Sequence, residues 1–176
     1  SLKIGPWDDP DADMGPLVTQ EHYDKVKGYV DLGVEEGAEL AVDGRGLSLQ
    51  GYEGGYFMGG SLFDRVTTDM RIYKEEIFGP VVSLIRFNNI DEAIDLINSR
   101  MFANAACLYT NSGKTAREFK YRILPAMIGI NIGIAAPMSF FPFGGAGESM
   151  FGDIKGQGRE IFQFYTDTKV TISRWL

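Results

Sequence analysis

The sequence predicts an α/β fold in which a largely parallel sheet carries helices on its flanks. Short apolar, β-branched runs alternate with segments of helical periodicity through the middle of the chain. The clearest strand is residues 80–87 (PVVSLIRF), which are apolar and β-branched over most of their length. Strands that alternate with helices are joined by right-handed crossovers, and such crossovers make neighbouring strands parallel.

The N-terminal part of the chain leads into this pattern. Proline, glycine and aspartate punctuate residues 1–16, which predicts an extended opening loop. From Thr19 onward apolar residues recur at three and four positions, which predicts a helix that Thr19 caps and Gly37 ends. Short strands are expected at residues 38–42, 56–58 and 61–66.

The remaining elements follow from the same signals. We expect helices at residues 91–98, 112–121 and 159–164, and strands at residues 80–87, 105–110 and 127–132. Residues 166–175 alternate polar and apolar side chains and predict a closing strand. No partner strand is adjacent in sequence, so this strand is expected to pair elsewhere or with another chain.

Composition excludes several classes of protein. At 176 residues, with 44% hydrophobic and 23% charged residues, the chain is expected to fold as one compact domain. A net charge of −7 without a basic cluster argues against a nucleic-acid partner. Prolines interrupt the longest apolar stretch, residues 123–138, so no membrane span is expected. One cysteine and no export signal favour a reducing, cytoplasmic setting.

The chain offers no convincing catalytic nucleophile or metal site. Cys107 lies in a predicted interior strand without a neighbouring base, which predicts a buried structural thiol. His22 is the sole histidine and sits on a helix beside acidic neighbours, which predicts a solvated position. Without a second histidine or spaced cysteines, a zinc site is not expected.

A glycine-rich loop at residues 144–147 (GGAG) follows a run of phenylalanines. It lacks the Lys-Ser or Lys-Thr pair of a phosphate-binding loop and the spacing of a dinucleotide fingerprint. A tight loop that lets the backbone approach a neighbour closely and a plain structural turn both remain compatible with it.

The segment before the clearest strand is a better candidate. Residues 73–80 (YKEEIFGP) place two acids and an aromatic directly ahead of it. A carboxylate there can accept hydrogen bonds from both hydroxyls of a ribose, and an aromatic two residues on can lie against a nicotinamide ring. The spacing alone does not decide for this interpretation, and acids before a strand are more commonly solvated loop residues.

Residues 75–81 (EEIFGPV) resemble a signature of NAD(P)-dependent aldehyde dehydrogenases, and the resemblance extends in order over essentially the whole chain. Its other parts are residues 15–18 (GPLV), Asn131, residues 142–145 (PFGG) and residues 165–170 (YTDTKV). Within that superfamily, the methylmalonate-semialdehyde dehydrogenase branch is resembled most, at residues 14–19, 37–45, 151–153 and 173–175. The chain departs from the pattern at Gly147, where a lysine is usual, and residues 132–138 match the branch loosely.

The resemblance implies a fold and a division of the chain. It implies a three-layer αβα half of an aldehyde dehydrogenase catalytic domain. Residues 1–16 would be the opening loop, residues 17–164 part of that domain, and residues 165–176 an oligomerisation strand. The parent enzyme would be a homo-oligomer, a dimer or a tetramer.

The resemblance also implies site residues and chemistry. Glu76 would hold the nicotinamide ribose of NAD, Phe78 would border the nicotinamide, and Phe143 would line the substrate end of the tunnel. In this family a cysteine thiolate attacks the aldehyde and a hydride passes to NAD. In this branch coenzyme A takes the acyl group and carbon dioxide is lost.

The family's catalytic cysteine and nucleotide-binding segments precede its Gly-Pro-Leu motif, so this chain would be an inactive C-terminal portion with no catalytic residue of its own. Two alternatives stay open. One is a non-catalytic binding or regulatory module that uses residues 140–143 as an interaction surface. The other is an acyl-phosphate or other aldehyde-handling relative. The choice of NAD over NADP and the use of coenzyme A are not decided by these residues.

Overall fold

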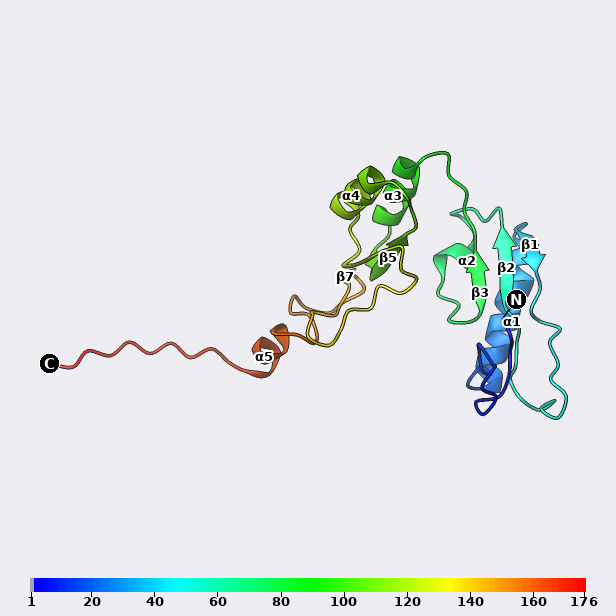
Figure 1. Ribbon diagram of the computed structural model, residues 1–176, viewed down its shortest axis with the longest axis horizontal. Helices are drawn as coiled ribbons and strands as arrows, with labels where there is room; N and C mark the ends of the chain where they lie inside the picture. Colours follow the sequence, from blue (N-terminus) through cyan, green and yellow to red (C-terminus); the bar gives the residue numbers. More distant parts are fainter. Residues whose placement is uncertain (1) are drawn as a thin grey trace. The chain divides into compact units, whose positions relative to one another are not determined.

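The computed structural model describes residues 2–176, which divide into two compact units, residues 2–86 and residues 87–176 (Figure 1). Each unit combines helices with short strands, so the expected α/β class is confirmed. None of the helices among the described residues is long and apolar enough to span a bilayer. The predicted division at residues 16 and 164 is not tested by the boundary between the units and stays a prediction.

The first unit builds a three-stranded mixed sheet. Strand β2 is central, antiparallel to β1 and parallel to β3. The elements are α1 (Gln20–Glu35), β1 (Glu39–Val42), β2 (Ser61–Asp64), α2 (Arg71–Lys74) and β3 (Val81–Ser83). Strand β3 is shorter than the predicted 80–87, although Leu84 still donates its backbone N–H to the Phe63 carbonyl at 2.8 Å.

Helix α1 forms for the local reasons the sequence suggests. The Thr19 hydroxyl accepts the backbone N–H of His22 at 3.1 Å, and Gly37 adopts a φ of 91° just beyond the helix end. The helix buries Val26, Val30 and Gly33. A Cβ at Gly33 would lie 2.7 Å from the Phe63 ring, so the glycine lets the helix approach the sheet closely.

One apolar cluster fills the first unit. Val26 and Val30 of α1 and Phe63 of β2 are fully buried at its centre. Its other buried members are Ala38, Met58, Val66, Met70, Ile72 and Ile77. The cluster therefore joins α1 to the sheet, to α2 and to the loop that precedes β3.

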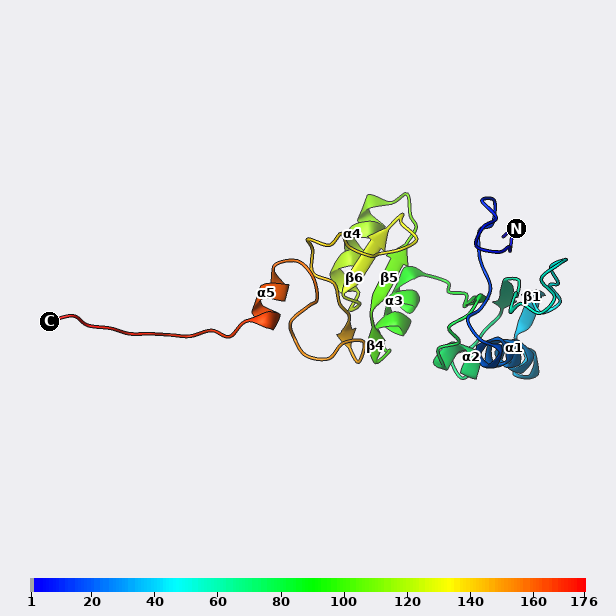
Figure 2. The ribbon, with the colours of Figure 1, turned by 90° about the horizontal axis from the view of Figure 1, so that it is seen from below.

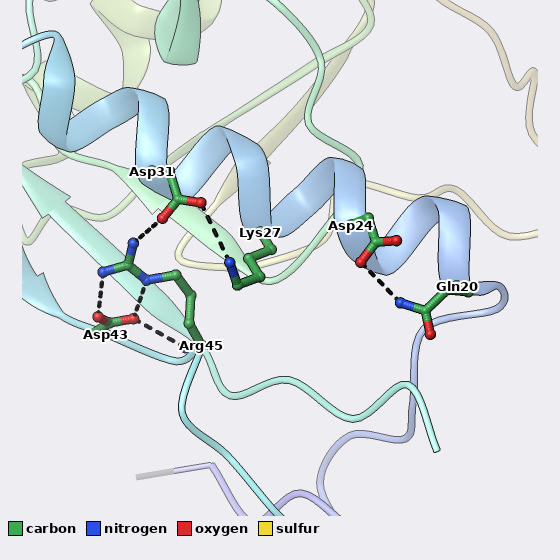
Figure 3. A network of polar contacts seen from close by, with 6 residues as sticks. All are labelled: Gln20, Asp24, Lys27, Asp31, Asp43 and Arg45. Atoms are coloured by element: carbon green, nitrogen blue, oxygen red, sulfur yellow. Dashed lines mark hydrogen bonds and ion pairs between the residues drawn. The ribbon is translucent and has the colours of Figure 1, made fainter. Parts of the chain in front are cut away.

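An ionic network ties the turn after β1 to α1 (Figure 3). Arg45 donates through Nε to Asp43 Oδ1 at 2.8 Å and also pairs with Asp31, which lies 3.6 Å from the Lys27 ammonium. The guanidinium of Arg45 lowers the pKa of Asp43 to about 2. The network fixes the turn against the solvent side of α1, away from the apolar cluster.

The second unit contains two separate strand pairs. Strand β5 pairs with β6 in parallel through α4, and β4 pairs with β7 antiparallel (Figures 1 and 2). The elements are α3 (Ile90–Asn98), β4 (Phe102–Ala103), β5 (Ala105–Leu108), α4 (Gly113–Arg122), β6 (Met127–Ile130), β7 (Ala146–Gly147) and α5 (Glu160–Tyr165). The parallel β5–β6 pair is the crossover that the strand-helix-strand pattern predicts.

The core of the second unit is small. Its buried members are Ile94 of α3 and Phe119 and Ile123 near the end of α4. Both helices pack on the face of the β5–β6 pair that carries Ala106, Leu108, Ile128 and Ile130. The prediction of a buried Cys107 was wrong because this residue lies on the other face, where it is exposed.

Two other segments predicted as strands, residues 56–58 and 166–175, are not strands in the described chain. Residues 56–58 form no strand, although the Tyr56 carbonyl accepts the Leu17 N–H at 2.9 Å. Residues 166–176 run as an exposed, extended trace that forms no sheet pairing within the described chain (Figures 1 and 2). An alternating sequence can satisfy the backbone as a strand only where a second edge is available. Its role in oligomerisation therefore stays a prediction.

Candidate functional site

The segment between α2 and β3 alternates buried and exposed side chains. Ile77 is 8% exposed and belongs to the apolar cluster, whereas Glu76 on one side and Phe78 on the other are exposed. Phe78 leaves 76% of its surface accessible, an unusual exposure for a large aromatic side chain. The burial of Ile77 thus presents a carboxylate and an aromatic ring two residues apart at the surface of the first unit.

The same segment fits closely against α1. A Cβ at Gly79 would lie 2.6 Å from Cγ2 of Val26, which is fully buried, so only glycine permits this approach. The backbone of Pro80 then accepts the Ser61 N–H at 2.8 Å and leads into β3. The segment is therefore held on both sides by the sheet and by the helix.

Glu75 is engaged within the protein. Tyr29 of α1 donates its hydroxyl to Glu75 at 2.6 Å, and Arg71 donates through Nε at 2.7 Å. The Arg71 hydrogen bond, followed by the Tyr29 hydrogen bond, lowers the pKa of Glu75 to about 2. The bond to this carboxylate also raises the pKa of Tyr29. Of the two adjacent acids, Glu75 therefore anchors the segment and Glu76 faces solvent.

Phe78 is held through its backbone. It adopts a left-handed conformation with a φ of 57°, and its carbonyl accepts a hydrogen bond from Nε2 of His22 at 2.6 Å. The two rings meet edge to face with centroids 6.2 Å apart. His22 is half-buried, and the contact of its ring with Phe78 was not predicted. The contact spans 56 positions and has no local sequence signal.

Phe143 lies in the second unit, and its backbone pairs with Gly156 through hydrogen bonds of 2.6 and 2.9 Å. Its side chain is 42% exposed. Phe143 thus belongs to the second compact unit, whereas Glu76 and Phe78 belong to the first.

The glycine loop beside Phe143 uses its glycines for close packing. Gly147 has a φ of 56°, and a Cβ there would lie 2.4 Å from the Met101 carbonyl. The lysine that the resemblance leads one to expect at this position would not fit this backbone. Lys155 instead reaches the loop and donates to the Gly145 carbonyl, at the border of a polar hollow of about 370 Å³. The tight-loop interpretation fits this geometry.

The other reactive side chains do not form a catalytic group among the described residues. The Cys107 thiol lies 3.7 Å from the Gly133 carbonyl oxygen, and a backbone carbonyl cannot act as a general base. The described residues contain no cluster of histidine, cysteine, aspartate and glutamate that could hold a metal ion.

Comparison with known proteins decides the family. The model of the Aldehyde dehydrogenase family matches residues 1–171. The chain belongs to the aldehyde dehydrogenase family. It is 48% identical over 175 residues to a malonate-semialdehyde dehydrogenase of Pseudomonas aeruginosa and 47% identical over 174 residues to another from Shouchella clausii. Each alignment covers 99% of this chain and 35% of the relative, so the chain spans about a third of the relatives' length.

Solved structures agree with this assignment. A Sinorhizobium meliloti protein described as a methylmalonate-semialdehyde dehydrogenase, in complex with NAD, superposes with a TM-score of 0.97 at 48% identity. This superposition covers 100% of the chain and 36% of that protein. A methylmalonate-semialdehyde dehydrogenase from Oceanimonas doudoroffii superposes with a TM-score of 0.95 at 40% identity, over 99% of the chain and 36% of that protein.

Proposed function

We propose that this chain is the C-terminal portion of an NAD-dependent aldehyde dehydrogenase whose substrate is malonate or methylmalonate semialdehyde. The observation that carries the proposal is the pair of exposed side chains, Glu76 and Phe78, on a segment that the protein fixes from both sides. Two similar proteins support the substrate class and the cofactor: the malonate-semialdehyde dehydrogenase of Pseudomonas aeruginosa and the NAD complex of the Sinorhizobium meliloti protein.

Each of these residues suits a part of NAD. The Glu76 carboxylate can accept hydrogen bonds from the two hydroxyls of the nicotinamide ribose, because an ionised carboxylate has several acceptor sites and no donor. The exposed Phe78 ring offers a flat apolar face to the nicotinamide. NAD, when bound, supplies the acceptor for the hydride that leaves the substrate. Phe143 would line the substrate end of the site.

We expect the catalytic nucleophile to lie in a part of the complete enzyme outside this chain. Cys107 is exposed on β5 beside the Gly133 backbone carbonyl, which cannot act as a general base for the thiol. We therefore expect no aldehyde oxidation by the isolated chain. In the complete enzyme, coenzyme A would take the acyl group and the substrate carboxylate would leave as carbon dioxide.

We also propose how the enzyme assembles and in which compartment it acts. The exposed alternating tail, residues 166–176, would add a strand to a neighbouring subunit of a homo-oligomer, because an alternating strand buries its apolar side only when it is paired. A reducing, cytoplasmic setting fits the single cysteine.

A second candidate is a non-catalytic binding module. Phe140 and Phe141 are 64% and 55% exposed with ring centroids 4.8 Å apart, which would suit a partner that buries aromatic anchors. The same rings would be covered inside a complete dehydrogenase. The two candidates separate on whether the chain supports catalysis when the rest of the enzyme is present.

A chimera tests the proposal directly. This chain would replace the matching 175 residues of the Pseudomonas aeruginosa relative, and NADH formation would be followed with malonate semialdehyde, with and without coenzyme A. We expect turnover that depends on both NAD and coenzyme A, at a rate within about tenfold of the unexchanged enzyme, since a tenfold change corresponds to only about 1.4 kcal/mol. A folded chimera with no turnover would contradict the proposal and favour the binding module. The isolated chain serves as the inactive control.

A further inference from the structure

Three residues on one side of α1 hold the segment that presents Glu76 and Phe78. His22, Val26 and Tyr29 follow each other at intervals of four and three, which places them on one face of a helix. His22 contacts the Phe78 carbonyl, Val26 packs under Gly79, and Tyr29 holds Glu75. Helix α1 thus fixes the segment immediately before Glu76 and again at Phe78.

The His22 contact is the one that bears on Phe78 itself. A carbonyl oxygen only accepts, so the hydrogen must be on Nε2 of His22. Both the neutral Nε2–H tautomer and the protonated imidazole meet this condition. The bond therefore does not depend on the charge of the ring.

The conformation of Phe78 needs such a contact. A residue with a Cβ is disfavoured at a φ of 57°, so surrounding interactions must hold it there. The hydrogen bond orients the peptide group that follows Phe78, and the edge of the His22 ring limits the rotation of the Phe78 ring. Without the bond, the backbone could relax toward negative φ and redirect the side chain.

We propose that His22 is a positioning residue for the nicotinamide end of the cofactor site. It acts through Phe78: the bond from Nε2 to the carbonyl keeps the ring, and with it the neighbouring Glu76 carboxylate, in the orientation that NAD requires. This inference rests on the proposed function of Glu76 and Phe78. It assigns His22 no direct part in the chemistry.

A matched pair of variants in the full-length chimera tests the role. His22→Gln keeps an amide N–H at nearly the reach of Nε2, whereas His22→Asn keeps the amide but is one methylene shorter and cannot reach the carbonyl. Gln20→Leu removes a polar contact two residues earlier on α1, the Gln20–Asp24 hydrogen bond of 2.9 Å that faces solvent (Figure 3), and serves as the control.

Two readouts are needed. The first is the KM for NAD, measured together with kcat so that a change in the KM is distinguished from a change in the turnover rate. The second is amide hydrogen exchange of Val81 in the absence of NAD. Its N–H donates to the Gly79 carbonyl at 2.7 Å, so its protection reports how firmly the segment is held, independently of the cofactor. For His22→Asn we expect faster exchange and a KM for NAD raised about three- to tenfold, the range that the loss of one hydrogen bond implies. His22→Gln should restore both values, and Gln20→Leu should leave both unchanged.

Glu76→Gln separates the two levels of the proposal. If it raises the KM for NAD while His22→Asn does not, the cofactor site stands and the positioning role of His22 is overturned. If neither variant changes the KM while exchange is faster in His22→Asn, the proposed function fails and the inference falls with it. Unchanged exchange in His22→Asn would also overturn the inference, because the bond would then not hold the segment.

Discussion

The two units differ in how fully they bury their apolar residues. The core cluster of the first unit contains nine buried residues contributed by both helices, the sheet and the connecting loops, whereas the core cluster of the second contains three, from α3 and from α4 and its end. The helix caps of the two units are equivalent, because Thr19, Asn89 and Ser112 each cap a helix through a side-chain oxygen. The local sequence signals for helices therefore work in both units. A larger core also needs elements that cover it from several sides, and among the described residues only the first unit has them.

This difference bears on the site. Glu76 and Phe78 stand on a segment whose Ile77 belongs to the larger core, so the expected cofactor contacts rest on a well-supported scaffold. Phe143 stands on a loop outside the smaller core. We therefore expect the proposed substrate contact at Phe143 to depend more on the rest of the enzyme than the proposed cofactor contacts at Glu76 and Phe78 do.

The largest expected effect comes from a substitution in the larger core, that of the first unit. Phe63→Ala removes a fully buried ring that packs against Gly33, and it should lower the free energy of opening of the first unit by about 3–5 kcal/mol. Native-state hydrogen exchange in the chimera measures this opening free energy separately for each unit. Slower or unchanged exchange of β2 amides would contradict the description of this core.

The matching change in the second unit should cost less. Phe119 is 3% exposed but has only two buried neighbours in its cluster, so the site can collapse more readily when the ring is removed. Phe119→Ala should lower the opening free energy of the second unit by about 3 kcal/mol, the low end of the range for a buried phenylalanine. A cost equal to that of Phe63→Ala, in the same exchange experiment, would show that the two cores are equivalent after all.

Helix caps should not distinguish the units. Thr19→Ala in the first unit and Asn89→Ala in the second each remove one side-chain acceptor for a backbone N–H, at 3.1 and 3.0 Å. Each change should cost about 1 kcal/mol, because capping depends on the first turn of the helix rather than on the core. Exchange rates of the first-turn amides of α1 and α3 provide the measurement. A clearly unequal cost would mean that tertiary packing contributes to one of these caps.

The smallest expected effect is a pH dependence of the first unit. The pKa of Glu75 in the folded chain is lowered from 4.5 to about 2, first by Arg71 and then by Tyr29. The unfolded chain therefore takes up the proton first as the pH falls. The stabilisation is complete above pH 4.5 and is lost as the pH falls from there toward 2. Glu75→Gln should flatten the dependence of the opening free energy on pH in this window, and an unchanged slope would exclude the carboxylate as its source.

The elements with complete local signals were predicted from the sequence. Helix α1 was placed between Thr19 and Gly37 because its cap, its periodicity and its terminal glycine are all local. The strand-helix-strand unit from β5 to β6 was placed for the same kind of reason. The resemblance pointed to Glu76 and Phe78, and the structure adds their exposure and their support.

The features set by long-range contacts were not predicted. His22 was expected on a solvated face because its neighbours on the helix are acidic, and its bond to the Phe78 carbonyl, 56 positions away, has no local signal. Cys107 was expected in the interior because its strand is apolar, yet only the opposite face of β5 is covered by α3 and α4. Residues 166–176 have the alternation of a strand but no edge to pair with among the described residues. In each case the sequence specifies the element but not what packs against it.

The dissociation constant of NAD in the Glu76→Gln chimera tests the central claim most directly. Glu53→Gln is the matched control, since Glu53 is an exposed carboxylate on the loop before β2 that accepts the Gly51 N–H at 2.8 Å. Hydrogen bonds to a charged group contribute about 1.5–3 kcal/mol, so Glu76→Gln should weaken NAD binding about ten- to a hundredfold. Glu53→Gln should leave it unchanged. Equal NAD affinity in the Glu76→Gln, Glu53→Gln and unsubstituted chimeras would contradict the assignment of this segment to the cofactor site.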